Sequence, residues 1–215
     1  MTTMESTVLA LAFGLAANVM ADVILRVRYR TTFVLDTATK RMKHRLRWVA
    51  CFAALLMAAL ALHMTALRLL LLALFSVTAA TDFEHKRLPW DWFLYGSTAL
   101  GIVVGFWESG PTGFRDAVIA QAIFFGMMTL TVVISGSAAG GDIKMMMQYG
   151  AASGHIVLAM AGLLLGTLAC WVPLRLFQFF ATASRKSQPL PLTVPMWVGL
   201  LLSFAIGGVY GIGIA

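Results

Sequence analysis

Two aspartates lie at the edges of apolar runs, where charged side chains are uncommon. Asp82 directly follows the run Leu69–Thr81, and Asp142 follows a Gly-Gly pair and precedes a short apolar segment. Ionisable residues at membrane depth generally mark functional sites. Two carboxylates brought together cannot both ionise easily, so one stays protonated. The ionised one can take a proton from water, while the protonated one polarises a carbonyl group and later protonates a leaving amine. This is the chemistry that aspartyl proteolysis requires.

The expected helix ends suggest different roles for the two carboxylates. Asp142 is predicted at a helix N-terminus, where the helix dipole favours negative charge, and Asp82 at a helix C-terminus, where it does not. We therefore hypothesise that Asp142 is the base and Asp82 the acid. Lys86 and Arg87 oppose this assignment, because they stabilise Asp82 as an anion. A structural interpretation also stays open, in which Asp142 is only a helix N-cap and Asp82 only an interfacial charge.

The elements that would position these aspartates are membrane helices. The chain has 215 residues, of which 60% are hydrophobic and 12% charged, and its mean hydropathy is +0.86. This composition predicts an all-α polytopic membrane protein with one domain, residues 1–215. The two cysteines, Cys51 and Cys170, lie inside apolar runs. Their number excludes a disulfide scaffold and a four-cysteine zinc site.

Eight apolar segments are predicted to form the helices. They are Val8–Leu25, Trp48–Leu62, Leu69–Thr81, Trp90–Trp107, Ala117–Ile134, Ile143–Gly154, His155–Leu174 and Val194–Ala215. Pro89 is expected in the first turn of the fourth helix, and Glu108–Gly113 is expected to be a turn. As a helix, Ile143–Gly154 would extend only about 18 Å, whereas the hydrocarbon core is about 30 Å thick. We expect it to cross only beside a wet cavity or in a thinned bilayer.

The basic residues predict which side of the membrane each connection faces. With eight crossings and both ends outside, only Arg68 and Arg115 fall outside, and this is a strong positive-inside bias. The residues on the cytoplasmic side are Arg26, Arg28, Arg30, Lys40, Arg41, Lys43, Arg45, Arg47, Lys86, Arg87, Lys144, Arg175, Arg185 and Lys186. Without the short helix, the last basic cluster would face out. Asp82 and Asp142 are therefore both expected at the cytoplasmic face.

The segment Val27–Arg47 is the only long polar segment and is predicted to be a basic cytoplasmic loop. Its charge suits anionic lipid headgroups, so membrane lipids are its expected partners. The net charge of +7 does not require nucleic acid as a partner, since the membrane topology accounts for it.

Two stretches, in this order, resemble motifs of the prepilin peptidases, the GxGD-type membrane aspartyl proteases that process type IV pilin precursors. The first is Asp82-Phe-Glu-His-Lys-Arg-Leu-Pro89, similar to the family's pattern of an aspartate, six further residues and a proline. The second is Ala139-Gly-Gly-Asp-Ile-Lys-Met145, similar to GGGD-[IV]-K-[LM]. A later stretch, Leu190–Gly199, resembles the family's last helix, where a proline-containing segment precedes a glycine.

The resemblance implies an endopeptidase of the bacterial inner membrane. Such an enzyme cuts a short charged leader from a prepilin at the cytoplasmic face, after a glycine that precedes the pilin's hydrophobic helix. Asp82 and Asp142 would be its catalytic aspartates. The residues that would support them are Gly140, Gly141, Lys144 and Pro89. The resemblance further implies a prepilin as the partner, no cofactor and no catalytic metal.

The chain departs from the family pattern at three places. Ala139 replaces the first glycine of GxGD and, unlike glycine, disfavours positive φ. Trp90 replaces the usual asparagine after the proline. The segment Val27–Arg47 contains no cysteine, whereas the large bifunctional members carry a domain with paired CxxC motifs at that place and also methylate the pilin. The chain therefore looks like the short peptidases of tight-adherence (Tad/Flp) pilus systems, and methyltransferase activity is not expected.

Two other classes of function stay open. One is a proton-coupled transporter with two membrane aspartates, which would more readily place its carboxylates near the bilayer midplane. The other is a catalytically inactive pilus-assembly protein, for which Ala139 is the indication.

Of three further charged residues, two have structural explanations. Asp22 is spaced to pair with Arg26 along one helix. Asp91 suits the N-terminal dipole of the fourth helix. For Lys144 two roles remain open, either contact with the Asp142 anion or a substrate carboxylate, or extension toward the membrane interface.

Overall fold

The computed structural model describes residues 2–29, 38–85, 88–135, 140–173, 176 and 192–210. Within these ranges the chain forms helices and no strand, which confirms the all-α prediction there. The elements are α1 (Thr3–Tyr29), α2 (Ala38–Leu60), α3 (Ala66–His85), α4 (Asp91–Ser135), α5 (Gly140–Ser153), α6 (Ile156–Gly166), the π-helical turn η1 (Thr167–Trp171) and α8 (Thr193–Tyr210).

Helix α4 is a hairpin of two helical arms, 91–109 and 111–135, joined at Gly110. Gly110 has φ +62°, a left-handed conformation that glycine adopts without strain, and Pro111 follows it. The arms meet closely beside this turn, where a Cβ atom on Gly113 would lie 2.1 Å from the carbonyl oxygen of Gly105. The chain therefore reverses within the predicted turn Glu108–Gly113, but only Gly110 leaves helical geometry, so the turn is tighter than predicted.

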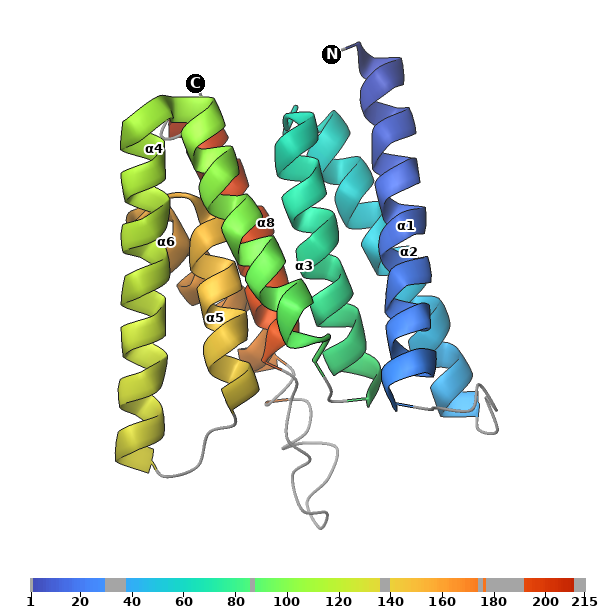
Figure 1. Cartoon of the computed structure of the whole chain (residues 1–215). Helices are drawn as coiled ribbons and strands as arrows, with labels where there is room; N and C mark the ends of the chain where they lie inside the picture. Colours follow the sequence, from blue (N-terminus) through green and yellow to red (C-terminus); the bar gives the residue numbers. More distant parts are fainter. Residues whose placement is uncertain are drawn as a thin grey trace.

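The helices pack in two groups that meet at α3 and α8. Helices α1, α2 and α3 pack together in one group, and α4, α5, α6 and α8 in the other. Successive helices run in opposite directions, with the two arms of α4 taken separately (Figure 1). As a result, the C-terminal end of α3 lies at the same end of the molecule as the N-terminal ends of α5 and α8 (Figure 1).

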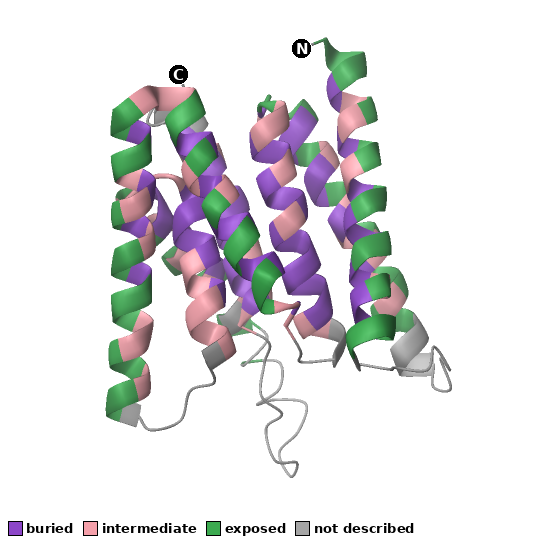
Figure 2. Cartoon of the chain, in the orientation of Figure 1, coloured by how far each residue is buried: buried purple, intermediate pink, exposed green. Residues whose placement is uncertain are grey.

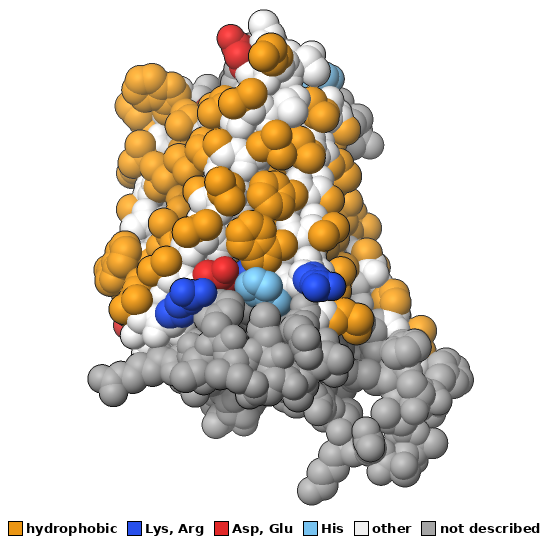
Figure 3. Space-filling view, turned by 90° about the vertical axis from the view of Figure 1, so that its right-hand side faces the viewer, with side chains coloured by type: hydrophobic (Ala, Val, Ile, Leu, Met, Phe, Trp, Pro, Cys, Tyr) orange, Lys and Arg blue, Asp and Glu red, His pale blue; other side chains and the backbone are white. Residues whose placement is uncertain are grey.

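Apolar side chains cover much of the outer surface. Buried residues follow the contacts between helices, and the outer sides are exposed (Figure 2). On α4, Trp107, Val133 and Ile134 are 78%, 74% and 77% exposed. The side formed by α1 and α2 is largely apolar, with charged side chains toward its edges (Figure 3). Contiguous exposed apolar surface of this extent suits contact with lipid rather than water.

Three helices among the described residues are long and apolar enough to cross a membrane: α1, α3 and α4. Two shorter apolar helices span Ile156–Cys170 and Thr193–Gly207. These features are compatible with a membrane protein, while the number of crossings stays a prediction.

Helices α6 and α8 approach each other through glycines. A Cβ atom on Gly162 would lie 2.2 Å from the carbonyl oxygen of Gly199, and one on Gly166 would lie 2.2 Å from that of Pro195. Small residues at such contacts allow the backbones of apolar helices to come close. The Tyr149 hydroxyl donates a hydrogen bond to the Ala159 carbonyl at 2.9 Å and so joins α5 to this pair.

The prediction that residues 27–47 form a loop is wrong for residues 27–29 and 38–47, which are helical. Helix α1 continues to Tyr29 and α2 begins at Ala38, while residues 30–37 lie outside the described residues. The stretch 38–47 is rich in Ala, Lys, Arg, Met and Leu, which favour helix even when charged. It therefore extends the apolar helix that follows, and its basic residues are carried by the first turns of α2.

Two helix starts also differ from the prediction. Pro89 lies before α4, which begins at Asp91, because the backbone carbonyl of Trp90 accepts the first helical hydrogen bonds. Helix α5 begins at Gly140 and has 14 residues. At about 1.5 Å per residue it extends about 21 Å, still less than a hydrocarbon core of about 30 Å.

Candidate functional site

Asp82 is held by a threonine from a distant part of the chain. Asp82 lies in the last turn of α3 and is partly buried. Thr193 is the first residue of α8 and is fully buried. Its hydroxyl donates a hydrogen bond of 2.6 Å to the Asp82 carboxylate oxygen Oδ2. The contact fixes the carboxylate against α8 without introducing a charge.

Asp142 lies in the first turn of α5, at the same end of the molecule as Asp82 (Figure 1). Helix α5 packs against both α3 and α8. The Thr78 hydroxyl donates to the Gln148 side-chain oxygen at 3.0 Å, and this buried bond joins α3 to α5. The two predicted aspartates therefore lie on α3 and α5, at one end of these two helices, which pack against each other and against α8. Since Gly140 and Gly141 precede Asp142 within α5, Asp142 is not the N-cap residue of that helix.

The two stretches that resemble family motifs contact each other. A Cβ atom on Gly141 would lie 2.6 Å from a methyl group of Leu88, so glycine leaves room there for the leucine side chain. Pro89, next to Leu88, is buried. Gly140 is the first residue of α5, and Ala139, Lys86 and Arg87 lie outside the described residues.

Lys144 forms an ion pair with Asp91, the first residue of α4, at 2.7 Å. Its Nζ also lies 5.6 Å from the centre of the Tyr95 ring. These contacts connect α5 to the start of α4, and neither of the two roles predicted for Lys144 is tested by them. Asp91 was expected to interact with the helix dipole, and the structure shows that it also forms an ion pair.

Asp22 forms a structural pair, but across two helices. Arg47 of α2 donates to its carboxylate at 2.5 Å, and the Arg47 side chain is 3% exposed. This contact joins α1 to α2, which sequence spacing along one helix does not reveal. The i,i+4 pairing of Asp22 with Arg26 stays a prediction.

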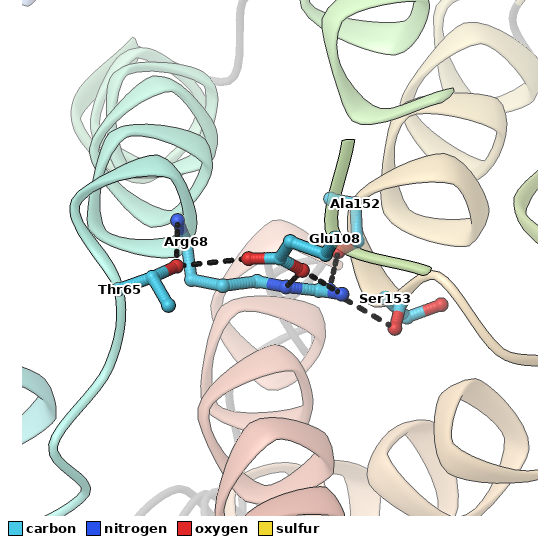
Figure 4. Close-up of polar contacts among 5 residues, drawn as sticks. All are labelled: Thr65, Arg68, Glu108, Ala152 and Ser153. Carbon is cyan, nitrogen blue, oxygen red and sulfur yellow. Dashed lines mark hydrogen bonds and ion pairs between the residues drawn. The ribbon is translucent and has the colours of Figure 1, made fainter. Parts of the chain in front are cut away.

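A second buried polar cluster lies at the opposite end of the molecule. Arg68 and Glu108 form an ion pair of 2.6 Å, and Thr65 donates to the same carboxylate at 2.8 Å (Figure 4). The Arg68 guanidinium also donates to the carbonyls of Ala152 and Ser153, at 3.2 and 3.5 Å (Figure 4). This cluster ties the start of α3 to the α4 turn and the end of α5.

Sequence reasoning missed Thr193. It lies within the stretch Leu190–Gly199, which drew attention only for its prolines and glycine. The available signal was a hydroxyl side chain at the start of an apolar helix on the expected cytoplasmic side. The hydroxyl's partner is 111 residues away in the chain, so no local pattern identifies it.

Among the described residues, no group of three or more His, Cys, Asp and Glu side chains is arranged to hold a metal ion. Comparisons with protein-family models, with curated proteins and with solved structures find no match. The functional interpretation therefore depends on the two aspartates, their positions at helix ends, and the sequence motifs around them.

Proposed function

We propose that this chain is a membrane aspartyl endopeptidase that removes the leader from type IV or Flp-like prepilins. The observation that carries the proposal is the position of Asp82 and Asp142 at one end of the packed helices α3, α5 and α8. The contact between Leu88 and Gly141, one from each motif, adds support. A transporter would more readily hold its carboxylates near the middle of the helices.

The proposed reaction uses water as the nucleophile. The ionised carboxylate takes a proton from water, and the resulting hydroxide attacks the scissile carbonyl carbon. The protonated carboxyl group donates a hydrogen bond to the carbonyl oxygen, on which negative charge develops. A proton then passes to the amide nitrogen, the C–N bond breaks, and the pair returns to its singly protonated state.

The roles of the two aspartates are set by opposing influences. The N-terminal end of α5 favours an ionised Asp142, and so favours Asp142 as the base. The Thr193 hydroxyl donates to Asp82 and favours an ionised Asp82 instead. The proposal therefore assigns one shared proton to the pair of carboxyl groups rather than to either residue.

The proposal includes eight membrane crossings in a bacterial inner membrane, with both termini outside. Asp82 and Asp142 then face the cytoplasm, and the Arg68–Glu108 cluster lies toward the outside. The basic residues of segment 27–47 would contact anionic lipid headgroups. The predicted positive-inside bias supports this orientation.

Purified protein incubated with a Flp-type prepilin tests the function. We expect two fragments, cut after the glycine that precedes the apolar helix, with the new pilin N-terminus unmethylated by mass spectrometry. The double variant Asp82→Asn/Asp142→Asn should be inactive. Asp116→Asn, at the opposite end beside Arg115, is the matched control and should cleave normally. Wild-type protein that cleaves no prepilin but supports proton-linked uptake would favour a transporter.

A further inference from the structure

An apolar groove of about 230 Å³ lies between α2, α3 and α8. Its floor is formed by Ser76, Ala79, Ala80 and Phe83 of α3. Its walls come from α2, including Ala50, and from α8, including Trp197. Helix α3 packs against both α2 and α8, so it lies at the bottom of the space that separates them.

The floor presents small side chains along one face of α3. Ser76, Ala79, Ala80 and Phe83 recur at intervals of three and four residues, which places them on one face of α3. Three of the four have small side chains. Small side chains on one face of an apolar helix allow a second helix to approach its backbone closely. From Ser76 to Phe83, seven helical rises, the floor extends about 10 Å, or about two helical turns.

Polar side chains that line the groove form hydrogen bonds or ion pairs within the protein. The Trp197 indole Nε1 donates to the Ser76 hydroxyl at 2.7 Å, and that hydroxyl donates to the Leu72 carbonyl at 2.7 Å. The Arg47 guanidinium, in the α2 wall, is paired with Asp22. The groove therefore offers an occupant an apolar surface with its main charge neutralised, which suits an apolar segment better than a polar peptide.

At one end, the groove is lined by the sequence neighbours of two candidate-site residues. Phe83 of the floor follows Asp82, and Val194 of the wall follows Thr193, which bonds to Asp82. An occupant that follows α3 to this end of the groove therefore comes near the helical turn that carries Asp82. If that occupant is a helix, its N-terminal end carries a partial positive charge that complements the carboxylate.

We propose that the groove holds the first two turns of the substrate's apolar helix, with the N-terminal end of that helix at Asp82. This inference rests on the proposed peptidase function and gives the groove a role in substrate recognition. The helix lies along α3, and the peptide bond that precedes it is thereby presented to the two aspartates. The groove selects substrates by an apolar helix directly after the cleavage site.

Filling the groove tests the proposal. Ala50→Trp places a large side chain in the wall, whereas Ala53→Trp adds the same side chain at an exposed position on the same helix. With a full-length prepilin, Ala50→Trp should raise KM about tenfold or more, and Ala53→Trp should leave it near wild type. A short peptide that ends three residues after the scissile bond should be cleaved equally by all three proteins. Equal KM values for the full-length substrate would overturn the proposal while leaving the peptidase function intact.

Cross-linking to the native Cys51 provides a second test that leaves the groove unaltered. Cys51 lines the groove, and Cys170→Ser removes the other cysteine. In the Asp82→Asn background, which retains uncleaved substrate, Cys51 should cross-link to a prepilin cysteine in the first two turns after the cleavage site. A cysteine four turns further on should not react. Cross-linking of Cys51 to a labelled lipid acyl chain, but to no prepilin position, would overturn the proposal. If the wild-type protein does not cleave the prepilin at all, the peptidase function itself is rejected.

Discussion

The two ends of the molecule hold their charged side chains in different ways. At one end, Arg68 is neutralised by Glu108 and also donates to two backbone carbonyls. At the other end, Asp82 accepts a hydrogen bond from the hydroxyl of Thr193. An ion pair keeps both partners charged and fixes three segments together. The Thr193 hydroxyl orients the carboxylate and is itself neutral, and under the proposed function this carboxylate takes part in proton transfer.

The largest effect on stability is expected at the Arg68 end. Glu108→Gln removes the negative partner from a guanidinium whose side chain is 8% exposed. It should lower the free energy of unfolding by about 3–5 kcal/mol, because an unpaired buried charge remains. Denaturant unfolding in detergent measures this, and cleavage per folded molecule should stay near wild type.

The matched control for Glu108→Gln is Asp116→Asn. Asp116 pairs with Arg115, whose side chain is 66% exposed, so the loss should be about 0–1 kcal/mol. Equal stability losses in the two variants would show that the Arg68–Glu108 pair has no special structural role.

At the opposite end, Thr193→Val should reduce activity more than stability. Valine keeps the shape of the side chain and removes the hydroxyl that bonds to Asp82. A hydrogen bond to a charged group contributes about 1.5–3 kcal/mol, so kcat should fall about 10- to 100-fold with little change in KM. Thr193→Ser retains the hydroxyl and should restore most of the rate. If serine and valine have the same effect, the hydroxyl does not position Asp82.

The glycine contact between α6 and α8 connects helix packing to the site, because α8 carries Thr193. A Cβ atom on Gly199 would lie 2.5 Å from the Gly162 carbonyl oxygen. Gly199→Val should therefore destabilise the fold by about 1–3 kcal/mol through overpacking. Gly126→Val is the comparison, since a Cβ atom at Gly126 meets nothing within 4 Å. Equal unfolding midpoints for the two variants would argue against close packing of α6 on α8.

The smallest effect is expected from Lys144→Gln. Lys144 and Asp91 are 24% and 59% exposed, and an exposed ion pair contributes about 0–1 kcal/mol. Cleavage should fall less than about fivefold. A much larger loss, with KM unchanged, would mean that Lys144 acts on the aspartates and not mainly through Asp91.

Sequence patterns predicted those features of this molecule that depend on residues close together in the chain. Apolar runs located the helices, Gly110 and Pro111 marked the α4 turn, and alternating helix directions brought Asp82 and Asp142 to one end. The start of α2 was missed because charge was taken as a sign of a loop, although lysine and arginine favour helix.

Contacts between distant segments were not predictable in the same way. Thr193 and Asp82 are 111 residues apart, and Arg68 and Glu108 are 40 apart. Such pairs depend on how helices rotate about their axes, which a single sequence constrains weakly. The groove has the same origin, since three helices each contribute one face to it.

The most direct measurement follows cleavage rate and unfolding midpoint in the same preparations of wild type, Asp82→Asn, Asp142→Asn and the double variant. If the two carboxylates act as one unit, each single substitution lowers the rate about a thousandfold or more, and the double variant is no worse. The unfolding midpoints should stay close to wild type, unlike that of Glu108→Gln. An Asp142→Asn variant that cleaves prepilin at the wild-type rate would contradict the paired-aspartate mechanism.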